Sequence, residues 1–106
     1  MLCATQTLGG DWKAVEGARL RSLFLGKELG DDVHYAYTFR ADGTFSGTEM
    51  AKEVRGTWRV TKTEICWTWT RPRGAEECYQ VETAGSDVRL LRKGAIAYFG
   101  ILKPAH

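Results

Sequence analysis

The sequence lacks the features that would tie a chain of this length to a membrane or to a familiar reaction. No apolar run among its 106 residues approaches the ~20 residues that a membrane-spanning helix needs. The first residues contain neither the basic nor the apolar segment of a signal peptide. Glycine-rich phosphate-binding motifs and the Gly-x-Ser-x-Gly motif of hydrolases are missing as well. We therefore expect no membrane span, no cofactor and no enzymatic activity.

The sequence also carries little net charge. Fifteen Lys and Arg residues stand against thirteen Asp and Glu residues, which leaves a formal net charge of +2. The two signs are interspersed, so the chain offers no basic patch for nucleic acid or for a membrane surface. With 43% hydrophobic and 26% charged residues, it has the balance of an ordinary globular domain. We predict one domain over residues 17–106, preceded by an extended lead over residues 1–16.

The acidic pairs and the histidine of the middle region do not form a catalytic pattern. Asp31 and Asp32 are adjacent, as are Glu76 and Glu77, and adjacent side chains in a strand or turn point to different faces. We interpret all four as solvated loop charges rather than as a general acid–base pair. His34 falls on the polar face of a predicted strand, which is typical of a surface histidine.

The apolar residues change their spacing once along the chain. Early in the sequence they recur at helical spacing, at Leu20, Leu23 and Phe24. A glycine follows at residue 26, where helices often end, so we predict a short helix over residues 18–25. Beyond residue 32 the spacing becomes two, which predicts a half-buried strand with Val33, Tyr35, Tyr37 and Phe39 on one face.

Turns and strand register can be deduced together, because a slip of one residue turns every side chain to the other face of a sheet. A three-residue loop over residues 41–43, with Gly43 in the left-handed bulge position, pairs Phe39 with Phe45 and buries both rings. A turn at residues 62 and 63 aligns the next two strands. It sets three pairs opposite each other: Val60 with Ile65, Trp58 with Trp67, and Gly56 with Trp69. We expect the glycine to leave room for the indole.

The same reasoning places two of the three cysteines side by side. A three-residue loop over residues 71–73 sets Ile65 opposite Tyr79 and Cys66 opposite Cys78. Directly opposed residues have Cβ atoms ~4.5–5.5 Å apart, close to the ~3.5–4.5 Å of a disulfide. We therefore predict a Cys66–Cys78 disulfide, with two free buried thiols as the alternative. A zinc site would need about four ligands, usually with short spacing between the cysteines, and is not expected.

The predicted disulfide bears on where the protein is found. Persistent disulfides occur in oxidising compartments, so we expect a periplasmic or secreted protein whose signal peptide has been removed. With unpaired cysteines the protein would instead be cytoplasmic. Cys3 is left over in the lead.

The remaining strands complete an antiparallel meander. A Gly85-Ser86 turn joins two strands. Residues 95–102 are apolar at both odd and even positions, as in a strand buried on both sides. With turn signals at a spacing of roughly 8–12 residues, six or seven strands result. We predict an all-β fold, a small antiparallel up-and-down β-barrel or a strongly curved sheet, with one short N-terminal helix. The edge after Leu102 would be open to another chain.

Five short segments carry a resemblance to a known family. In order they are "LRSLFLGKEL", "YTFRADGTFSG", "GTWRV", "ICWTW" and "CYQVE". Together they resemble a family of small secreted bacterial proteins of unknown function, over residues 18–84. The resemblance implies a lipocalin-like barrel and brings no activity or catalytic residue. The missing signal peptide and the Lys62-Thr63 turn depart from the family pattern.

Aromatic side chains at inward positions are the most unusual feature. Tyr and Trp combine an apolar ring with a polar tip. Six of them are our candidate ligand-binding residues: Tyr35, Tyr37, Trp58, Trp67, Trp69 and Tyr79. They either fill a small barrel or line one open end, with the helix near its mouth, that holds a small apolar or amphipathic ligand. The second interpretation makes the chain a non-enzymatic binding protein.

Two other functions stay open. A periplasmic protease inhibitor could offer the lead, residues 1–16, to a protease cleft. A single-strand nucleic-acid binder of the OB type would stack bases on Trp67 and Trp69 and contact phosphates through Arg71 and Arg73. The near-neutral charge argues against a nucleic-acid partner. Trp12, in the lead, is expected outside the barrel.

Overall fold

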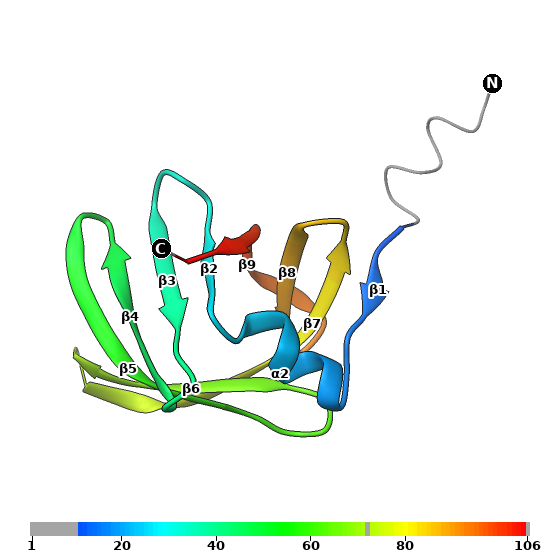
Figure 1. Ribbon diagram of the computed structural model, residues 1–106, viewed down its shortest axis with the longest axis horizontal. Coiled ribbons are helices and arrows are strands. Elements are labelled where there is room, and N and C mark those ends of the chain that lie inside the picture. The colour runs from blue at the N-terminus through cyan, green and yellow to red at the C-terminus, as the bar shows by residue number, and fades with distance from the viewer. Residues whose placement is uncertain (1–10, 72, 106) are drawn as a thin grey trace.

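The computed structural model describes residues 11–71 and 73–105, which form a closed antiparallel barrel with one short helix (Figure 1). The elements are β1 (Lys13–Ala14), α2 (Ala18–Phe24), β2 (Lys27–Gly30), β3 (Tyr35–Phe39), β4 (Thr44–Glu49), β5 (Lys52–Val60), β6 (Ile65–Arg71), β7 (Arg73–Ala84), β8 (Asp87–Arg92) and β9 (Ala95–Pro104). Each strand from β2 to β9 is antiparallel to the next. The predicted all-β barrel with an N-terminal helix is confirmed.

Strand β2 closes the barrel and was not predicted from the sequence. It pairs with β3 on one side and with β9 on the other, where Lys27 lies opposite Pro104 and Gly30 opposite Ile101. The expected open edge after Leu102 is therefore wrong, because that edge is covered by β2. The strand escaped prediction because it has only four residues and buries only Leu29, which is too short a segment for its alternation to be recognised.

The registers deduced from the sequence are confirmed at most positions. Phe39 lies opposite Phe45, and Trp58 lies opposite Trp67. The predicted pairs of Val60 with Ile65, Gly56 with Trp69, Ile65 with Tyr79 and Cys66 with Cys78 are also present. The loop after β6 differs from the prediction, because a bulge between Thr68 and Thr70 pairs Thr70 with Arg73 instead of with the following glycine. The bulge inserts a residue into one strand only, so the sequence alternation gives no sign of it.

Gly56 makes room for a different ring from the one expected. A Cβ atom at this position would lie 2.9 Å from the Cε1 atom of Phe45 and would collide with the carbonyl oxygen of Thr68. The glycine therefore admits the Phe45 ring and the backbone of β6, while Trp69 lies opposite it in the ladder. Any larger residue here would push β5 and β6 apart.

Helix α2 matches its prediction, lies between β1 and β2 and covers the end of the barrel that carries the turns after β3 and β5 (Figure 1). Its end is fixed by the amide of Leu25, which donates to the carbonyl of Arg21, and by Gly26 at φ 73°. Leu20 and Phe24 on its inner face have no exposed surface. These two apolar side chains of the helix thus extend the core that the strands form.

The described part of the predicted lead is attached to the barrel. Lys13 and Ala14 pair with β7, and the next residue, Val15, donates its amide to the carbonyl of Val81 at 3.0 Å. Val15 is buried in the core. Trp12 lies outside the barrel, as expected, where its ring meets Phe99 edge-on. The predicted lead thus adds a short strand to β7 before the helix begins.

Candidate binding site at the tyrosine end of the barrel

The two ends of the barrel are built differently. One end, the helix end, carries the turns after β3, β5 and β7 and is covered by α2. There the Phe24 ring packs edge-on against Phe39 with centroids 5.3 Å apart, and the Trp58 indole donates to the carbonyl of Arg40 at 2.9 Å. The opposite end carries the turns after β2, β4 and β8. We call it the tyrosine end, because the four tyrosines of the chain converge toward it.

The six candidate residues all face the barrel interior, but only five of them lie together. Trp58 belongs to the helix end, where the guanidinium of Arg21 lies 5.0 Å from its ring centroid. The other five rings form one cluster toward the tyrosine end: Tyr35, Tyr37, Trp67, Trp69 and Tyr79. The helix therefore does not lie near the mouth that these rings would form, which corrects the arrangement expected from the sequence.

Within this cluster the rings fill the middle of the barrel. Neighbouring centroids lie between 5.0 and 6.3 Å apart, mostly with edge-on or tilted ring planes, which are the favourable geometries for aromatic pairs. Tyr37 and Trp67 have no exposed surface, whereas Trp69 is half-buried. The middle of the barrel is thus packed with side chains, and only the outer part of the cluster meets solvent.

Tyr98 of β9 is the residue that the sequence reasoning missed. Its half-buried ring packs against four rings of the cluster: Tyr35, Tyr37, Trp67 and Tyr79, at 5.4 to 6.1 Å. It therefore covers the cluster from the side of β9. No alternation marks residues 95–102 as having an inner and an outer face. A register shift between Leu90 and Leu91 of the facing strand β8 also changes which residues of β9 pair with inward-facing residues.

The polar tips of these rings are not all hydrogen-bonded. The Tyr79 hydroxyl donates to Glu77 Oε1 at 2.7 Å, and the Tyr35 hydroxyl donates to the carbonyl of Phe99 at 2.8 Å. In contrast, the Tyr37 hydroxyl and the Trp67 indole Nε1 are buried and have no hydrogen-bond partner within 3.5 Å in the described part of the chain. Tyr98 and Glu49 lie within longer reach of the Tyr37 hydroxyl. Buried donors are nearly always satisfied in folded proteins, so two in one cluster mark this place as unusual.

Two glutamates complete the tyrosine end. Glu77 is half-buried and binds Tyr79, while its neighbour Glu76 points outward and forms a bidentate ion pair with Arg59 at 2.7 and 2.8 Å. Adjacent residues do point to different faces, as expected, but the interpretation of Glu77 as a solvated loop charge is wrong. Glu49, the last residue of β4, is half-buried on the same inward parity as Phe45. That parity was the signal that could have identified both carboxylates.

The hydroxyl groups at this end are neutral over the whole physiological range. Burial raises the pKa of all four tyrosines above the ordinary value. The negative charge of Glu49 raises the pKa of Tyr37 and Tyr98 further, and that of Glu77 raises the pKa of Tyr79 and Tyr98. The carboxylates therefore lie within electrostatic reach of the hydroxyl tips, which remain able to donate hydrogen bonds.

The other acidic pair lies at the turn between β2 and β3. Oδ1 of Asp31 accepts hydrogen bonds from the amides of Val33, His34 and Tyr35, and Oδ2 lies 2.8 Å from Nδ1 of His34. Desolvation alone would raise the pKa of Asp31, but these hydrogen bonds together lower it well below the ordinary range. Asp31 and His34 thus shape this turn, whereas exposed Asp32 forms an ion pair with Lys103 of β9 at 3.3 Å.

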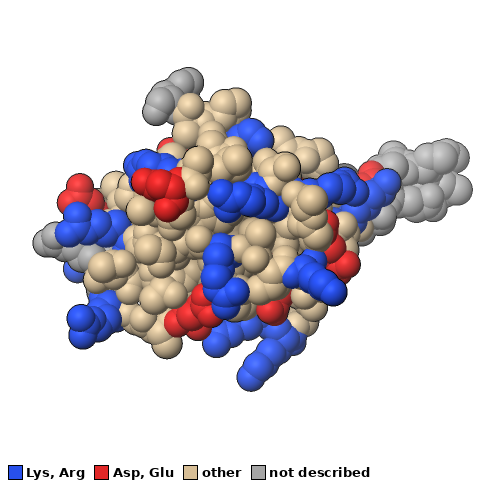
Figure 2. Space-filling view, turned by 60° about the horizontal axis from the view of Figure 1, so that its bottom comes forward, with Lys and Arg blue, Asp and Glu red and all other residues tan. Residues whose placement is uncertain are grey.

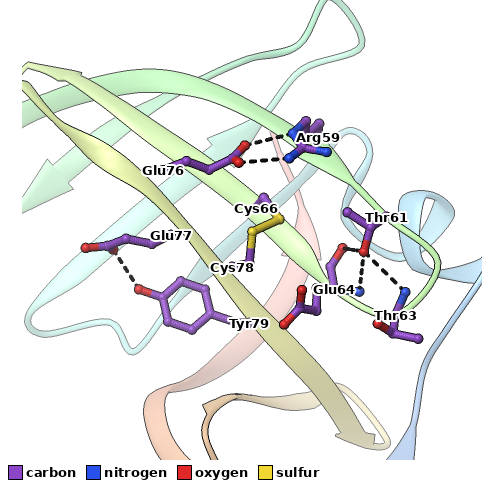
Figure 3. Close-up of a disulfide and its surroundings, with 9 residues drawn as sticks. All are labelled: Arg59, Thr61, Thr63, Glu64, Cys66, Glu76, Glu77, Cys78 and Tyr79. Carbon is purple, nitrogen blue, oxygen red and sulfur yellow. Dashed lines mark hydrogen bonds and ion pairs between the residues drawn. A yellow bond between two sulfur atoms is a disulfide. The ribbon is translucent and has the colours of Figure 1, made fainter.

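The cysteines form the predicted disulfide on the outer face of the sheet (Figure 3). Cys66 and Cys78 are directly opposed in β6 and β7, with Cα atoms 4.0 Å apart. Glu64 lies within 4.8 Å of both sulfur atoms, but bonded sulfurs offer no thiolate to a metal. Cys3 lies outside the described residues. The disulfide staples the hairpin that carries Trp67, Trp69 and Tyr79.

The residues proposed for base stacking do not form an open platform. Trp67 is fully buried, and Trp69 is packed against Phe45 with centroids 5.0 Å apart. Arg73 is exposed in β7, and the side chain of Arg71 lies outside the described part. The face drawn in Figure 2 carries basic and acidic side chains of both signs interspersed. Trp67 and Trp69 therefore do not form the exposed stacking surface that this hypothesis requires.

Comparisons with protein-family models, with curated proteins and with solved structures found no match to this chain. The resemblance to small secreted bacterial proteins therefore stays a prediction from sequence. Among the described residues, no helix is long and apolar enough to cross a membrane.

Proposed function

We propose that this chain is a non-enzymatic binding protein of an oxidising compartment, the periplasm or the extracellular space, that holds a small amphipathic ligand at its tyrosine end. The observation that carries the proposal is the pair of buried, unpartnered donors, the Tyr37 hydroxyl and the Trp67 indole, within a cluster of rings whose tips converge on one end. The Cys66–Cys78 disulfide supports the compartment, because such bonds persist where thiols are oxidised.

The energetic argument starts from the two donors. A buried donor without a partner costs about 1–3 kcal/mol, because it loses its hydrogen bonds to water and gains none in return. A ligand that brings a polar group into the cluster would recover part of this cost, while the surrounding rings would hold its apolar part. Both halves of an amphipathic molecule are thereby accommodated in one place.

Access to the cluster depends on Tyr98. Its ring is half-exposed and lies over Tyr35, Tyr37 and Tyr79, so a ligand would enter by turning this ring toward solvent. Turning the ring separates it from its four aromatic neighbours, so part of the ligand's binding free energy offsets these lost contacts, and removing the ring removes this cost. Tyr98→Ala should therefore bind a ligand at least as well as the unaltered protein.

A matched pair of variants tests the proposal. The protein is titrated with Nile red, a neutral apolar dye, and binding is followed by its fluorescence and by quenching of tryptophan emission. Tyr37→Phe removes the unpartnered hydroxyl, so it should leave the free energy of unfolding unchanged or higher and yet weaken dye binding. Tyr35→Phe removes the hydroxyl that is already bonded to Phe99, so it should lower stability by about 0.5–1.5 kcal/mol and leave dye binding unchanged.

The contrary result is also defined. If the unaltered protein and Tyr98→Ala both leave the dye in water, the aromatic cluster is only a core and the proposed function fails.

A further inference from the structure

The charge at the tyrosine end differs from the charge on the outside of the barrel. On the outer face, acidic side chains meet cations of the chain: Glu76 with Arg59, Glu82 with Arg89, and Glu28 with Lys103. Glu49 and Glu77 form no such ion pair with any described side chain. Both are half-buried, so solvent screens them less than it screens a carboxylate on the open surface.

The two carboxylates lie on different strands and both act on the same group. Glu49, at the end of β4, lies opposite Tyr35, and Glu77 in β7 accepts a hydrogen bond from Tyr79. The rings of both tyrosines pack against Tyr98, at 5.5 and 5.6 Å. Burial raises the pKa of Tyr98, and the two carboxylate charges raise it further. Exposed Arg92 is a described cation whose charge reaches this end, where it lowers the pKa of Tyr79 against the larger effect of burial. Two half-buried carboxylates thus lie beside the outer rings of the cluster.

The rings at this end add a second preference for positive charge. The face of an aromatic ring attracts cations through its quadrupole. The chain already uses this interaction elsewhere, with Arg21 over Trp58 at 5.0 Å and Arg89 over Trp12 at 4.3 Å. Trp69 and Tyr98, both half-buried at the tyrosine end, have no cation over them from the described side chains.

We propose that the tyrosine end binds a small organic cation of the alkylammonium class, with the rings around its apolar part and Glu49 and Glu77 facing its charge. The buried Tyr37 hydroxyl, which faces Tyr98 and Glu49 without a hydrogen-bond partner within 3.5 Å, would contribute a further oxygen to the cation's surroundings. An anion would meet two carboxylates and is disfavoured, and a neutral ligand would leave them without a role. This inference rests on the proposed binding function and adds the chemical class of its ligand.

The test compares two molecules of the same shape. Choline carries a quaternary nitrogen, and 3,3-dimethyl-1-butanol has a neutral carbon at the same place. Each is titrated into the disulfide-bonded protein and followed by calorimetry, and by tryptophan fluorescence in a Trp12→Phe, Trp58→Phe background in which only Trp67 and Trp69 emit. Choline should bind roughly ten-fold or more tightly than the alcohol, and its affinity should fall with added salt.

Two adjacent glutamates provide the matched control. Glu77→Gln keeps an acceptor for Tyr79 and removes the charge, so it should weaken choline binding several-fold and leave the alcohol unchanged. Glu49→Gln should do the same. Glu76→Gln removes a charge of the same sign one residue away but on the outer face, so it should leave choline binding as it is.

Each contrary outcome is informative. If choline and the alcohol bind equally, or neither binds while Nile red does, the cation class is overturned and the proposed binding function stands. If Glu76→Gln weakens choline binding as much as Glu77→Gln does, choline is held by the outer surface and the inference is overturned. If choline, the alcohol and the dye all fail to bind the unaltered protein, both proposals fail together.

Discussion

The same substitution is expected to change stability in opposite directions at the two central tryptophans. Trp58 and Trp67 face each other across β5 and β6 and are both buried. The indole of Trp58 donates to the carbonyl of Arg40 and lies under the guanidinium of Arg21, whereas the indole nitrogen of Trp67 has no partner. Replacing either residue by Phe removes a similar volume from the core, so the difference between the two variants isolates the polar contribution.

The magnitudes follow from these contacts. Trp58→Phe loses a hydrogen bond of about 0.5–1.5 kcal/mol and a cation–π contact of about 0.5–1 kcal/mol. The Arg40 carbonyl still accepts from the amide of Gly43, so no further penalty is added. Trp67→Phe instead relieves a buried donor that costs about 1–3 kcal/mol. We therefore expect Trp67→Phe to be more stable than Trp58→Phe by about 2–5.5 kcal/mol.

The assay is urea unfolding followed by far-ultraviolet circular dichroism, with the disulfide intact in both variants. Circular dichroism is preferred because the substitutions themselves change tryptophan fluorescence, and equal slopes would show that both variants unfold from the same state. Trp67→Ala serves as the reference for a lost ring and should cost about 3–5 kcal/mol. If Trp67→Phe is as destabilising as Trp58→Phe, the Trp67 indole is hydrogen-bonded in solution and the argument from unpartnered donors is refuted.

Three further outcomes are expected. Gly43 lies at φ 89°, so Gly43→Val should cost well over about 1 kcal/mol in chemical denaturation and Gly43→Asn less; equal stabilities would contradict the left-handed loop. Mass spectrometry of unreduced peptides should recover Cys66 joined to Cys78, and reduction of this bond should lower stability by about 2–3 kcal/mol; a link from either cysteine to Cys3 would contradict the pairing. Because all four tyrosines have raised pKa values when folded, their stabilising contribution is complete below the unfolded pKa of about 10 and is lost as the pH rises above it. Absorbance near 295 nm should therefore show tyrosinate only as the protein unfolds, and ionisation at ordinary pH in the folded state would argue against burial.

Register could be predicted from the sequence wherever two constraints met at one hairpin. The loop before Phe45 and the loop after β5 each had to bury aromatic residues on both strands, and only one pairing did so. Cys66 and Cys78 added a distance requirement to the same kind of argument. The prediction lost accuracy where only one constraint applied, as at the end of β6, where nothing in the sequence opposes the bulge next to Thr70.

The candidate site was predicted less completely than the fold, for a related reason. Alternation of apolar and polar residues reveals an inward position only when the residue there is hydrophobic. The rings of Tyr37 and Trp67 could therefore be predicted, whereas inward residues that are charged could not. Glu49 and Glu77 are an even number of residues from Phe45 and Tyr79 and so face inward with them. In the sequence, however, a charged residue near a strand end is interpreted as part of a loop. Tyr98 escaped because its segment is apolar on both parities and its register shifts at a bulge.

These omissions point to a physical asymmetry between the two ends. In an eight-stranded barrel, side chains fill the middle, but inward positions at the strand ends face whatever covers that end. At the helix end the covering is apolar, because Phe24 packs edge-on against Phe39 and Leu20 is buried in the same core. At the tyrosine end the inward positions instead carry Glu49 and Glu77, both half-buried. Carboxylates on inward parity at one end only are costly for a barrel that is merely a core, because each loses part of its hydration. They are reasonable for a barrel whose open end meets a polar or charged partner, which is why we place the function there.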